Sequence, residues 1–469
     1  MTSSYRLLID GALVDGASTL DVIDPATSRP FVACARANPA QLDQAVDAAG
    51  RAFSTWSRRP VGERRAYLER LADAMEARFV DFATLLTREQ GKPLGQAQFE
   101  IGGTIAALRH FAAMDVKTSI LREDADARII EHRTALGVVA AITPWNFPMI
   151  LLMLKVAPAL ITGNTVIAKP APSTPLTTLL LGEVAADILP PGVFSTIVDD
   201  NDLGPLITAH PGIAKISFTG STQTGKRVMA SAAGTLKRLT LELGGNDAAV
   251  VLDDADVAVV APPIFAAATL NAGQVCLAAK RVYAPRAIYD ELCNALATLA
   301  KASVVGDGLK EGTEIGPIQN RRQFDKVQEY LKDAASDGTI IAGGDVLDRP
   351  GYFVSPTVVR DISEDSRLVR EEQFGPIIPV LVYDDLEDVI TRINAGDFGL
   401  GGTVWTSDPE RGQQVAMRID TGTVWVNQHM VLPFEIPFGG VKQSGIGREQ
   451  GVAGLHEFTQ PKIVNVALR

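Results

Sequence analysis

Cys276 is the residue in this sequence best suited to act as a nucleophile. It lies in the segment Asn-Ala-Gly-Gln-Val-Cys-Leu, directly after an apolar run with helical patterning. A lone cysteine in such surroundings is more often a small buried hydrophobe, so its chemistry depends on the groups that accompany it. A thiolate that attacks a carbonyl carbon needs a base and a donor for the oxyanion that develops.

Two other residues could supply these groups. Glu242 ends a predicted strand in Leu-Glu-Leu-Gly-Gly-Asn, where adjacent glycines imply a close approach of the backbone. A carboxylate there is a candidate general base. Asn146, in the rigid turn Thr-Pro-Trp-Asn-Phe-Pro, could direct its amide at an oxyanion. Taken singly, Glu242 could be solvated or ion-paired, and Asn146 could be a turn residue that bonds its own backbone.

A dinucleotide site is indicated by residues 216–225, Ile-Ser-Phe-Thr-Gly-Ser-Thr-Gln-Thr-Gly. A strand here runs into a turn and then a helix, whose free amides could bind a pyrophosphate. Gly220, Ser221 and Gly225 are the candidate residues. The spacing departs from the Gly-x-Gly-x-x-Gly fingerprint, so by itself the segment would be an ordinary strand-to-helix turn.

Three further residues could contact the ribose or the nicotinamide. Lys169 ends a predicted strand and could direct its ammonium at hydroxyls or phosphate. Thr174 and Pro175 are expected to cap and begin the next helix, which places the residues between in a loop. Glu372 and Phe374 combine a hydroxyl-binding acid with a ring-packing aromatic. When each segment is taken by itself, Lys169 could equally be a surface lysine, Glu372 a solvated glutamate and Phe374 a core residue.

The segments that carry these residues alternate between strand-like and helical patterns. Apolar spacing over 41–89 predicts a helical layer, and the alternation that follows predicts parallel sheets with helices on both faces. The fold class is therefore α/β, with a Rossmann-like dinucleotide-binding domain, a second α/β catalytic domain and a small β-ribbon. Strands are expected at 135–142, 165–168, 195–198 and 213–218, then at 248–252, 281–284, 377–381, 402–405 and 423–427.

The predicted domain boundaries are 1–117 with 135–244, 245–442, and 118–134 with 443–469 for the ribbon. Exposed strands need a cover, which predicts a neighbouring subunit over the ribbon. We expect a homodimer or a homotetramer.

Composition limits the possible partners. The chain has 469 residues, 46% of them hydrophobic, and a formal net charge of -11, so no basic field attracts nucleic acid or an anionic membrane. The three cysteines are widely spaced, which predicts no metal site and a reducing compartment. Cys34 and Cys293 are expected in the core. The N-terminus has no targeting pattern, so a cytoplasmic location is expected.

Seven motifs, in order and at matching spacing over nearly the whole chain, closely resemble the aldehyde dehydrogenase superfamily, in its NAD(P)-dependent, non-acylating, acid-forming branch. They are Pro-Trp-Asn-Phe-Pro (144–148), Lys-Pro (169–170), Phe-Thr-Gly-Ser (218–221), Leu-Glu-Leu-Gly-Gly (241–245), Gly-Gln-Val-Cys (273–276), Glu-Gln-Phe-Gly-Pro (372–376) and Pro-Phe-Gly-Gly (437–440).

The resemblance implies a covalent mechanism. Cys276 would attack the aldehyde, and the Asn146 amide with the cysteine's own N–H would stabilise the oxyanion, after which nicotinamide accepts a hydride. Glu242 would activate the water that hydrolyses the thioester, which favours a free acid over an acyl-coenzyme A. Lys155 matches a lysine sometimes assigned to a proton relay, although a snorkelling lysine explains it as well.

The resemblance also implies the cofactor contacts. Pro172 stands where NAD-preferring relatives often carry a glutamate. A proline can neither bind ribose hydroxyls nor repel a 2′-phosphate, so NAD or NADP is expected, with no preference between them. The implied contacts are Ile142, Thr143, Pro144, Trp145, Lys169, Pro172, Phe218, Gly220, Ser221, Gly225, Leu243, Glu372 and Phe374.

The implied substrate tunnel is mostly apolar and has no evident arginine. It predicts a medium-sized apolar or aromatic aldehyde; a semialdehyde or amino-aldehyde dehydrogenase, and a non-catalytic dinucleotide-binding homologue, are the alternatives. Glu435 could meet a cationic or hydroxylated substrate at the tunnel mouth, but a solvated loop carboxylate is the ordinary interpretation. The tunnel positions are Phe147, Met149, Ile150, Leu154, Leu270, Val275, Leu277 and Phe438.

Overall fold

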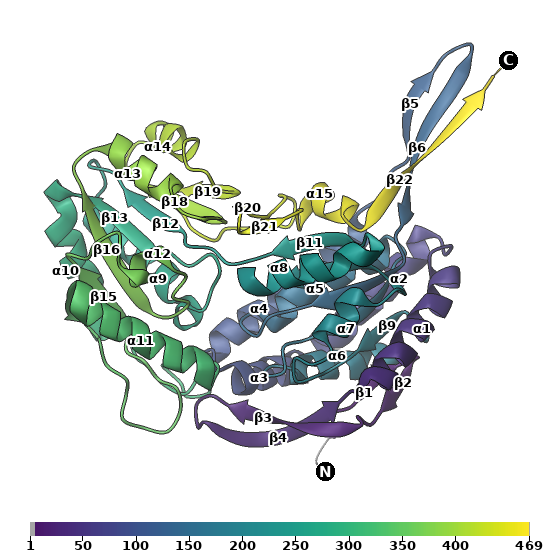
Figure 1. Ribbon diagram of the computed structural model, residues 1–469, viewed down its shortest axis with the longest axis horizontal. Helices are drawn as coiled ribbons and strands as arrows, with labels where there is room; N and C mark the ends of the chain where they lie inside the picture. Colours follow the sequence, from purple (N-terminus) through teal and green to yellow (C-terminus); the bar gives the residue numbers. More distant parts are fainter. Residues whose placement is uncertain (1–4, 469) are drawn as a thin grey trace.

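Two sheets form the frame of the molecule, and the chain crosses from one to the other directly after Glu242 (Figure 1). The computed structural model describes residues 5–468. The mixed α/β architecture with parallel sheets that the sequence predicts is confirmed.

The first sheet has eight strands in the order β2-β1-β9-β8-β7-β10-β11-β21. From β7 the chain proceeds to β8 and β9 on one side, and later to β10 and β11 on the other, so the strand order reverses between β7 and β10. Ligands of open α/β sheets bind outside the carboxyl ends of the strands at such a switch point. The strands are β1 (Leu7–Ile9), β2 (Ala12–Val14), β7 (Val138–Ile142), β8 (Thr165–Lys169), β9 (Phe194–Thr196), β10 (Ile213–Thr219), β11 (Arg238–Glu242) and β21 (Gly445–Ile446).

Helices cover both faces of this sheet, and every residue of β7 and β8 is buried. The helical layer predicted over 41–89 is confirmed as α1, α2 and α3, whereas α4 was not predicted. The helices are α1 (Pro39–Trp56), α2 (Val61–Ala77), α3 (Phe79–Gln90), α4 (Leu94–Ala113), α5 (Pro148–Ile161), α6 (Leu176–Ala186), α7 (Gly204–Ala209) and α8 (Thr222–Ala232).

The second sheet has seven strands in the order β14-β15-β16-β13-β12-β18-β19. Its five predicted strands are confirmed, while the edge strand β14 and its neighbour β15 were missed. The strands are β12 (Ala248–Val251), β13 (Arg281–Pro285), β14 (Thr339–Ala342), β15 (Thr357–Arg360), β16 (Ile377–Tyr383), β18 (Gly401–Trp405) and β19 (Thr423–Val426), and the helices are α9 (Val257–Thr269), α10 (Arg286–Ala302), α11 (Arg321–Asp337), α12 (Arg367–Arg370), α13 (Leu386–Asn394) and α14 (Pro409–Ala416).

A three-stranded ribbon of β5 (Ser119–Glu123), β6 (Ala127–Ala135) and β22 (Thr459–Ala467) projects from the body, as the sequence predicts (Figure 1). The strand predicted at 135–142 is confirmed over 138–142 as β7, but Ala135 belongs to β6, because Gly137, at a φ of 140°, lies between the two strands. The segment 443–469, which was predicted as part of the ribbon, also supplies β21 to the first sheet and forms α15 (Gly451–His456). The domain boundaries themselves stay a prediction.

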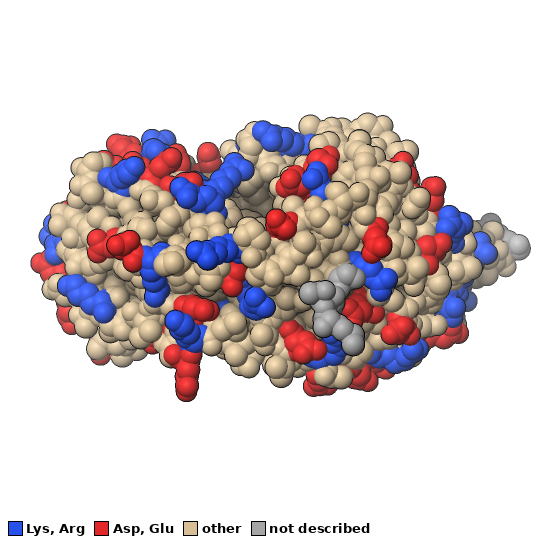
Figure 2. Space-filling view, turned by 90° about the horizontal axis from the view of Figure 1, so that it is seen from below, with Lys and Arg blue, Asp and Glu red and all other residues tan. Residues whose placement is uncertain are grey.

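Charges of both signs are interspersed over the face seen in Figure 2. In the described part of the chain, none of the helices combines the length and the apolar character that crossing a membrane would require.

The predicted cap of α6 is wrong. Pro175, not Thr174, occupies the capping position, and the Thr174 hydroxyl has no partner among the described residues. Glu89, fully buried at the end of α3, caps the helix instead: its carboxylate accepts the N–H groups of Leu176 (2.6 Å) and Thr177 (3.0 Å). A charge-assisted bond from a distant helix therefore replaces the local cap.

Replacing Glu89 with alanine should lower the free energy of unfolding by about 1–3 kcal/mol, because the Leu176 and Thr177 amides would stay buried without an acceptor. Thr174→Val, which removes a hydroxyl that makes no bond, should change it by less than about 0.5 kcal/mol. Thermal unfolding of the two variants at pH 8 measures both. Equal losses would contradict the assignment of the cap to Glu89.

Candidate functional site

Four parallel strands of the first sheet end side by side at one edge. Ile142 of β7 is in register with Lys169 of β8 and with Phe218 of β10, and Thr219 pairs with Glu242 of β11. The turns after these strands carry Asn146 and the 220–225 segment. The register thus gathers most of the predicted residues at the switch point between β7 and β10.

The buried Asn146 side chain connects this edge to the second sheet. Its Nδ2 donates to the carbonyl oxygen of Gln274 at 2.9 Å, two residues before Cys276. The backbone carbonyl oxygen of Asn146 accepts from Asn271 Nδ2 (3.0 Å) and from Lys92 Nζ (2.9 Å). An amide nitrogen has two hydrogens, so one remains for an oxyanion.

The loop before Cys276 has an unusual backbone. Asn271, Ala272 and Gly273 all have positive φ angles, of 51°, 55° and 71°. A side chain on Gly273 would meet the Gly375 carbonyl oxygen at 2.3 Å. Gln274 holds the loop, since its Nε2 donates to the Asn271 carbonyl (2.8 Å) and its Oε1 accepts from a backbone amide. Such strained conformations persist only where the surroundings fix them, and they are common at functional sites.

Cys276 differs from the other two cysteines in its exposure. Its side chain is half-buried, whereas Cys34 and Cys293 are buried core residues, as predicted. Burial raises the pKa of the Cys276 thiol to about 12; a nearby lysine opposes the rise and the carboxylates of Glu372 and Glu242 add to it. The thiol is therefore protonated at neutral pH and requires activation to attack.

Glu242 is buried at the end of β11, and neither carboxylate oxygen has a hydrogen-bond partner within residues 5–468. Burial, and then the charge of Glu449, raise its pKa well above the usual range. Lys155 lies nearby, with its Nζ bonded to Thr219 Oγ1 (2.7 Å) and ion-paired with Glu449. The Lys155 side chain is fully buried, so the snorkelling interpretation is wrong.

An apolar cluster surrounds Cys276. Of the predicted tunnel residues, Phe147, Leu270, Val275, Leu277 and Phe438 belong to it, whereas Met149, Ile150 and Leu154 pack with the core of the first domain. The sequence did not predict the remaining members, which are Ala278, Leu400, Trp425, Met430 and Leu432.

Comparisons with known proteins agree with this geometry. Residues 13–464 match the aldehyde dehydrogenase family. The chain is 38% identical to a betaine aldehyde dehydrogenase of Rhizobium etli, over 96% of this chain and 94% of that protein. It is 40% identical to an aldehyde dehydrogenase of a Fusarium species, over 94% of each chain.

The chain belongs to the aldehyde dehydrogenase family. Among solved structures, the NAD+ complex of an aldehyde dehydrogenase from Bacillus cereus superposes with a TM-score of 0.97 at 34% identity, covering 100% of this chain and 97% of that one. This protein is an NAD(P)-dependent aldehyde dehydrogenase, as the sequence predicts.

The switch-point residues of this aldehyde dehydrogenase fit a dinucleotide. The amide end of α8 follows Gly220, and Ser221 caps it. A side chain on Gly225 would meet Leu243 Cδ2 at 2.5 Å, so glycine permits close packing of α8 on the sheet. The Thr143 hydroxyl is buried at this edge without a partner among the described residues.

Other predicted cofactor residues already have partners. Lys169 Nζ forms an ion pair with the buried Asp199 at 2.6 Å. Glu372 Oε1 accepts the Gly245 N–H at 3.0 Å. The rings of Trp145 and Phe374 meet edge to face, with centroids 5.4 Å apart. The other positions, Ile142, Pro144, Pro172, Phe218 and Leu243, lie on the strand ends or the loops after them.

Sequence reasoning missed the charged residues that support the site. Lys92, ion-paired with Glu100 at 2.5 Å, holds the Asn146 backbone carbonyl, and Glu100 accepts the Met149 N–H in the first turn of α5. Glu449 lies 294 positions from Lys155. No local pattern could have found these pairs, because each partner resembles an ordinary surface charge in its own segment. Lys280, a positive charge four residues after Cys276, was the one signal of a supporting charge that the sequence offered.

The raised pKa of Glu242 makes stability depend on pH. The folded state holds this proton more tightly than the unfolded chain, so the stability of the wild type falls as pH rises from about 4.3 toward the folded-state pKa. In Glu242→Gln the side-chain amide does not titrate. The stability of this variant relative to wild type should therefore be greater at pH 8 than at pH 5 in thermal unfolding.

Glu435→Gln is the matched control, because the Glu435 side chain is exposed. It should show no such pH-dependent difference. A difference for Glu242→Gln that is the same at both pH values would contradict the raised pKa.

Proposed function

We propose that this enzyme oxidises an aldehyde to the carboxylic acid through a covalent intermediate on Cys276. The observation that carries the proposal is the hydrogen bond from Asn146 Nδ2 to the Gln274 carbonyl, because it joins the amide to the nucleophile loop. Glu242, with no hydrogen-bond partner among the described residues, supplies a carboxyl group at the end of β11, two strands from β7.

In this proposal the Cys276 sulfur, once deprotonated, forms a bond to the aldehyde carbon. The negative charge that develops on the aldehyde oxygen is stabilised by the free hydrogen of Asn146 Nδ2 and by the Cys276 N–H. A bound nicotinamide supplies the hydride acceptor. When the C–H bond of the adduct breaks with loss of hydride, the oxyanion becomes a carbonyl and the carbon remains attached to Cys276 as a thioester.

Glu242 removes a proton from the water that attacks the thioester, and the acid leaves as the Cys276 sulfur is released. Its buried position favours the neutral carboxyl, so the group must lose its proton before it acts as a base. Lys155, Thr219 and Glu449 form a polar chain beside it that can exchange this proton.

The apolar cluster around Cys276 supports a medium-sized apolar or aromatic aldehyde as the substrate. Some relatives are betaine aldehyde dehydrogenases, so a cationic aldehyde is the second candidate. Glu435, in the loop next to Phe434, is the carboxylate that would favour it, but its side chain is exposed to solvent. The cluster combines the rings of Phe147, Trp425 and Phe438, which could face a quaternary ammonium, with aliphatic side chains against which desolvating a cation is costly. The aliphatic members and the exposed position of Glu435 support the apolar choice.

We further propose that Lys169, Ser221, Gly220, Glu372 and Phe374 contact the dinucleotide. Pro172 leaves the adenosine ribose without a carboxylate from that position, so both NAD and NADP are accepted. The projecting ribbon supports a homodimer or homotetramer in which β22 is covered by a neighbouring subunit. The proposed location is the cytoplasm.

The test is NADH and NADPH formation with hexanal, benzaldehyde, betaine aldehyde and succinate semialdehyde. The apolar aldehydes should have the higher kcat/KM, because only they match the cluster around Cys276. Equal or better turnover of succinate semialdehyde or betaine aldehyde would contradict the substrate assignment.

Cys276→Ala should lower kcat at least about a thousandfold, because no other group can form the thioester. Cys293→Ala, in the core, is the matched control and should retain kcat while losing stability. Turnover retained in Cys276→Ala would contradict the covalent mechanism.

A further inference from the structure

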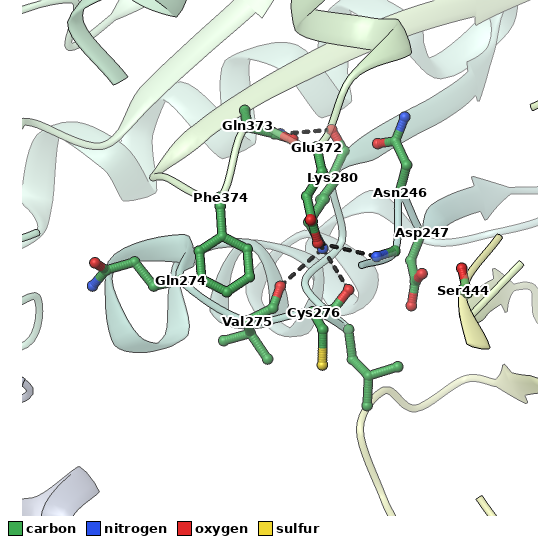
Figure 3. Close-up of polar contacts among 12 residues, drawn as sticks. Asn246, Asp247, Gln274, Val275, Cys276, Lys280, Glu372, Gln373, Phe374 and Ser444 are labelled. Atoms are coloured by element: carbon green, nitrogen blue, oxygen red, sulfur yellow. Dashed lines mark hydrogen bonds and ion pairs between the residues drawn. The ribbon is translucent and has the colours of Figure 1, made fainter. Parts of the chain in front are cut away.

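Lys280 lies behind the nucleophile loop, and the reaction as proposed above does not use it. Its side chain is 2% exposed. Its Nζ donates to the carbonyl oxygens of Val275 (2.8 Å) and Cys276 (2.5 Å). In Figure 3 the Cys276 carbonyl faces this ammonium, while the sulfur points away from it.

The same ammonium faces the carboxylate of Glu372. Lys280 Nζ lies 3.7 Å from Glu372 Oε1, which also accepts the Gly245 N–H. The backbone of Lys280 is fixed as well, since its carbonyl oxygen accepts from Gln373 Nε2 at 3.1 Å (Figure 3). Lys280 therefore connects the segment that carries the nucleophile to the segment that carries Glu372.

The charges that face Cys276 are mostly negative. Glu372, Asp247 and Glu242 each raise the pKa of the thiol, and Lys280 is the cation that lowers it. A cation near a thiol favours the thiolate, and its effect is strongest where water is excluded. Without Lys280, the half-buried thiol would face these three acidic side chains with no compensating charge from this group.

We propose that Lys280 is a positioning residue for the nucleophile, which fixes the Val275 and Cys276 carbonyls against the Glu372 segment and whose positive charge favours the Cys276 thiolate. The inference rests on the proposed role of Cys276. It assigns to Lys280 an effect on thiol reactivity that a lysine needed only for packing would not have.

The test is the rate of Cys276 alkylation by iodoacetamide in the full-length, cofactor-free protein, followed by mass spectrometry from pH 6 to 9. Lys280→Gln keeps a donor for one carbonyl but removes the charge, and Lys280→Arg keeps the charge. Lys326→Gln is the matched control, because Lys326 Nζ donates to the Glu372 backbone carbonyl (3.0 Å) and does not contact the nucleophile loop.

Lys280→Gln should shift the pH–rate curve toward higher pH by about one unit. The alkylation rate would then be about tenfold slower at each pH below the thiol pKa. Lys280→Arg should stay within about threefold of wild type, and Lys326→Gln should superimpose on it. A Lys280→Gln curve that superimposes on wild type or lies above it, as a loosened and more exposed loop would give, overturns the proposal. So does a Lys280→Arg variant as slow as Lys280→Gln.

Alkylation needs no turnover, so this result is independent of the proposed function. If Cys276→Ala kept full activity while Lys280→Gln still slowed alkylation, the proposed reaction would fail and the effect of Lys280 on the thiol would stand. If Cys276→Ala were inactive and Lys280→Gln alkylated normally, only the inference about Lys280 would fail.

Discussion

The hydrogen bond between Asn146 Nδ2 and the Gln274 carbonyl is the contact on which the site depends. Asn146 follows the first sheet's β7, and Gln274 precedes β13 of the second sheet, 128 positions later. Neither sheet holds a complete set of reacting groups. The strained backbone of 271–273 makes sense in this context, because it turns the loop so that the Gln274 carbonyl reaches the amide. The two sheets must therefore be packed together before the oxyanion donor and the nucleophile can meet.

Ion pairs hold the parts of this junction, and the lysine of each pair is buried. Lys92–Glu100 lies under Asn146, Lys155–Glu449 beside Glu242, Lys169–Asp199 at the end of β8, and Lys280–Glu372 behind Cys276. Removing two charges from water costs about as much free energy as their attraction returns, so such pairs add little to stability. Their positions suggest another use: each fixes a backbone or side-chain group at the site.

The sequence allowed the site to be predicted where chemistry and local pattern coincide. Glu242 and Lys169 end strands, and Gly225 lies where α8 packs on Leu243, so short motifs locate them. Contacts between distant segments carry no such pattern. The cap of α6 by Glu89 was missed because a local threonine offered a simpler cap, and Glu449 was missed because its partner lies in α5. The missed strands β14 and β15 are short, with four residues each.

The most direct test of the account is the mass of the intermediate in Glu242→Gln. This variant, mixed with excess NAD+ and an apolar aldehyde, should retain the acyl group because its water is not activated. Intact-protein and peptide mass spectrometry should find Cys276 heavier by the mass of the aldehyde less two hydrogens. An unmodified Cys276 in a variant that forms acid at the wild-type rate, or the adduct on Cys34 or Cys293, would contradict the account.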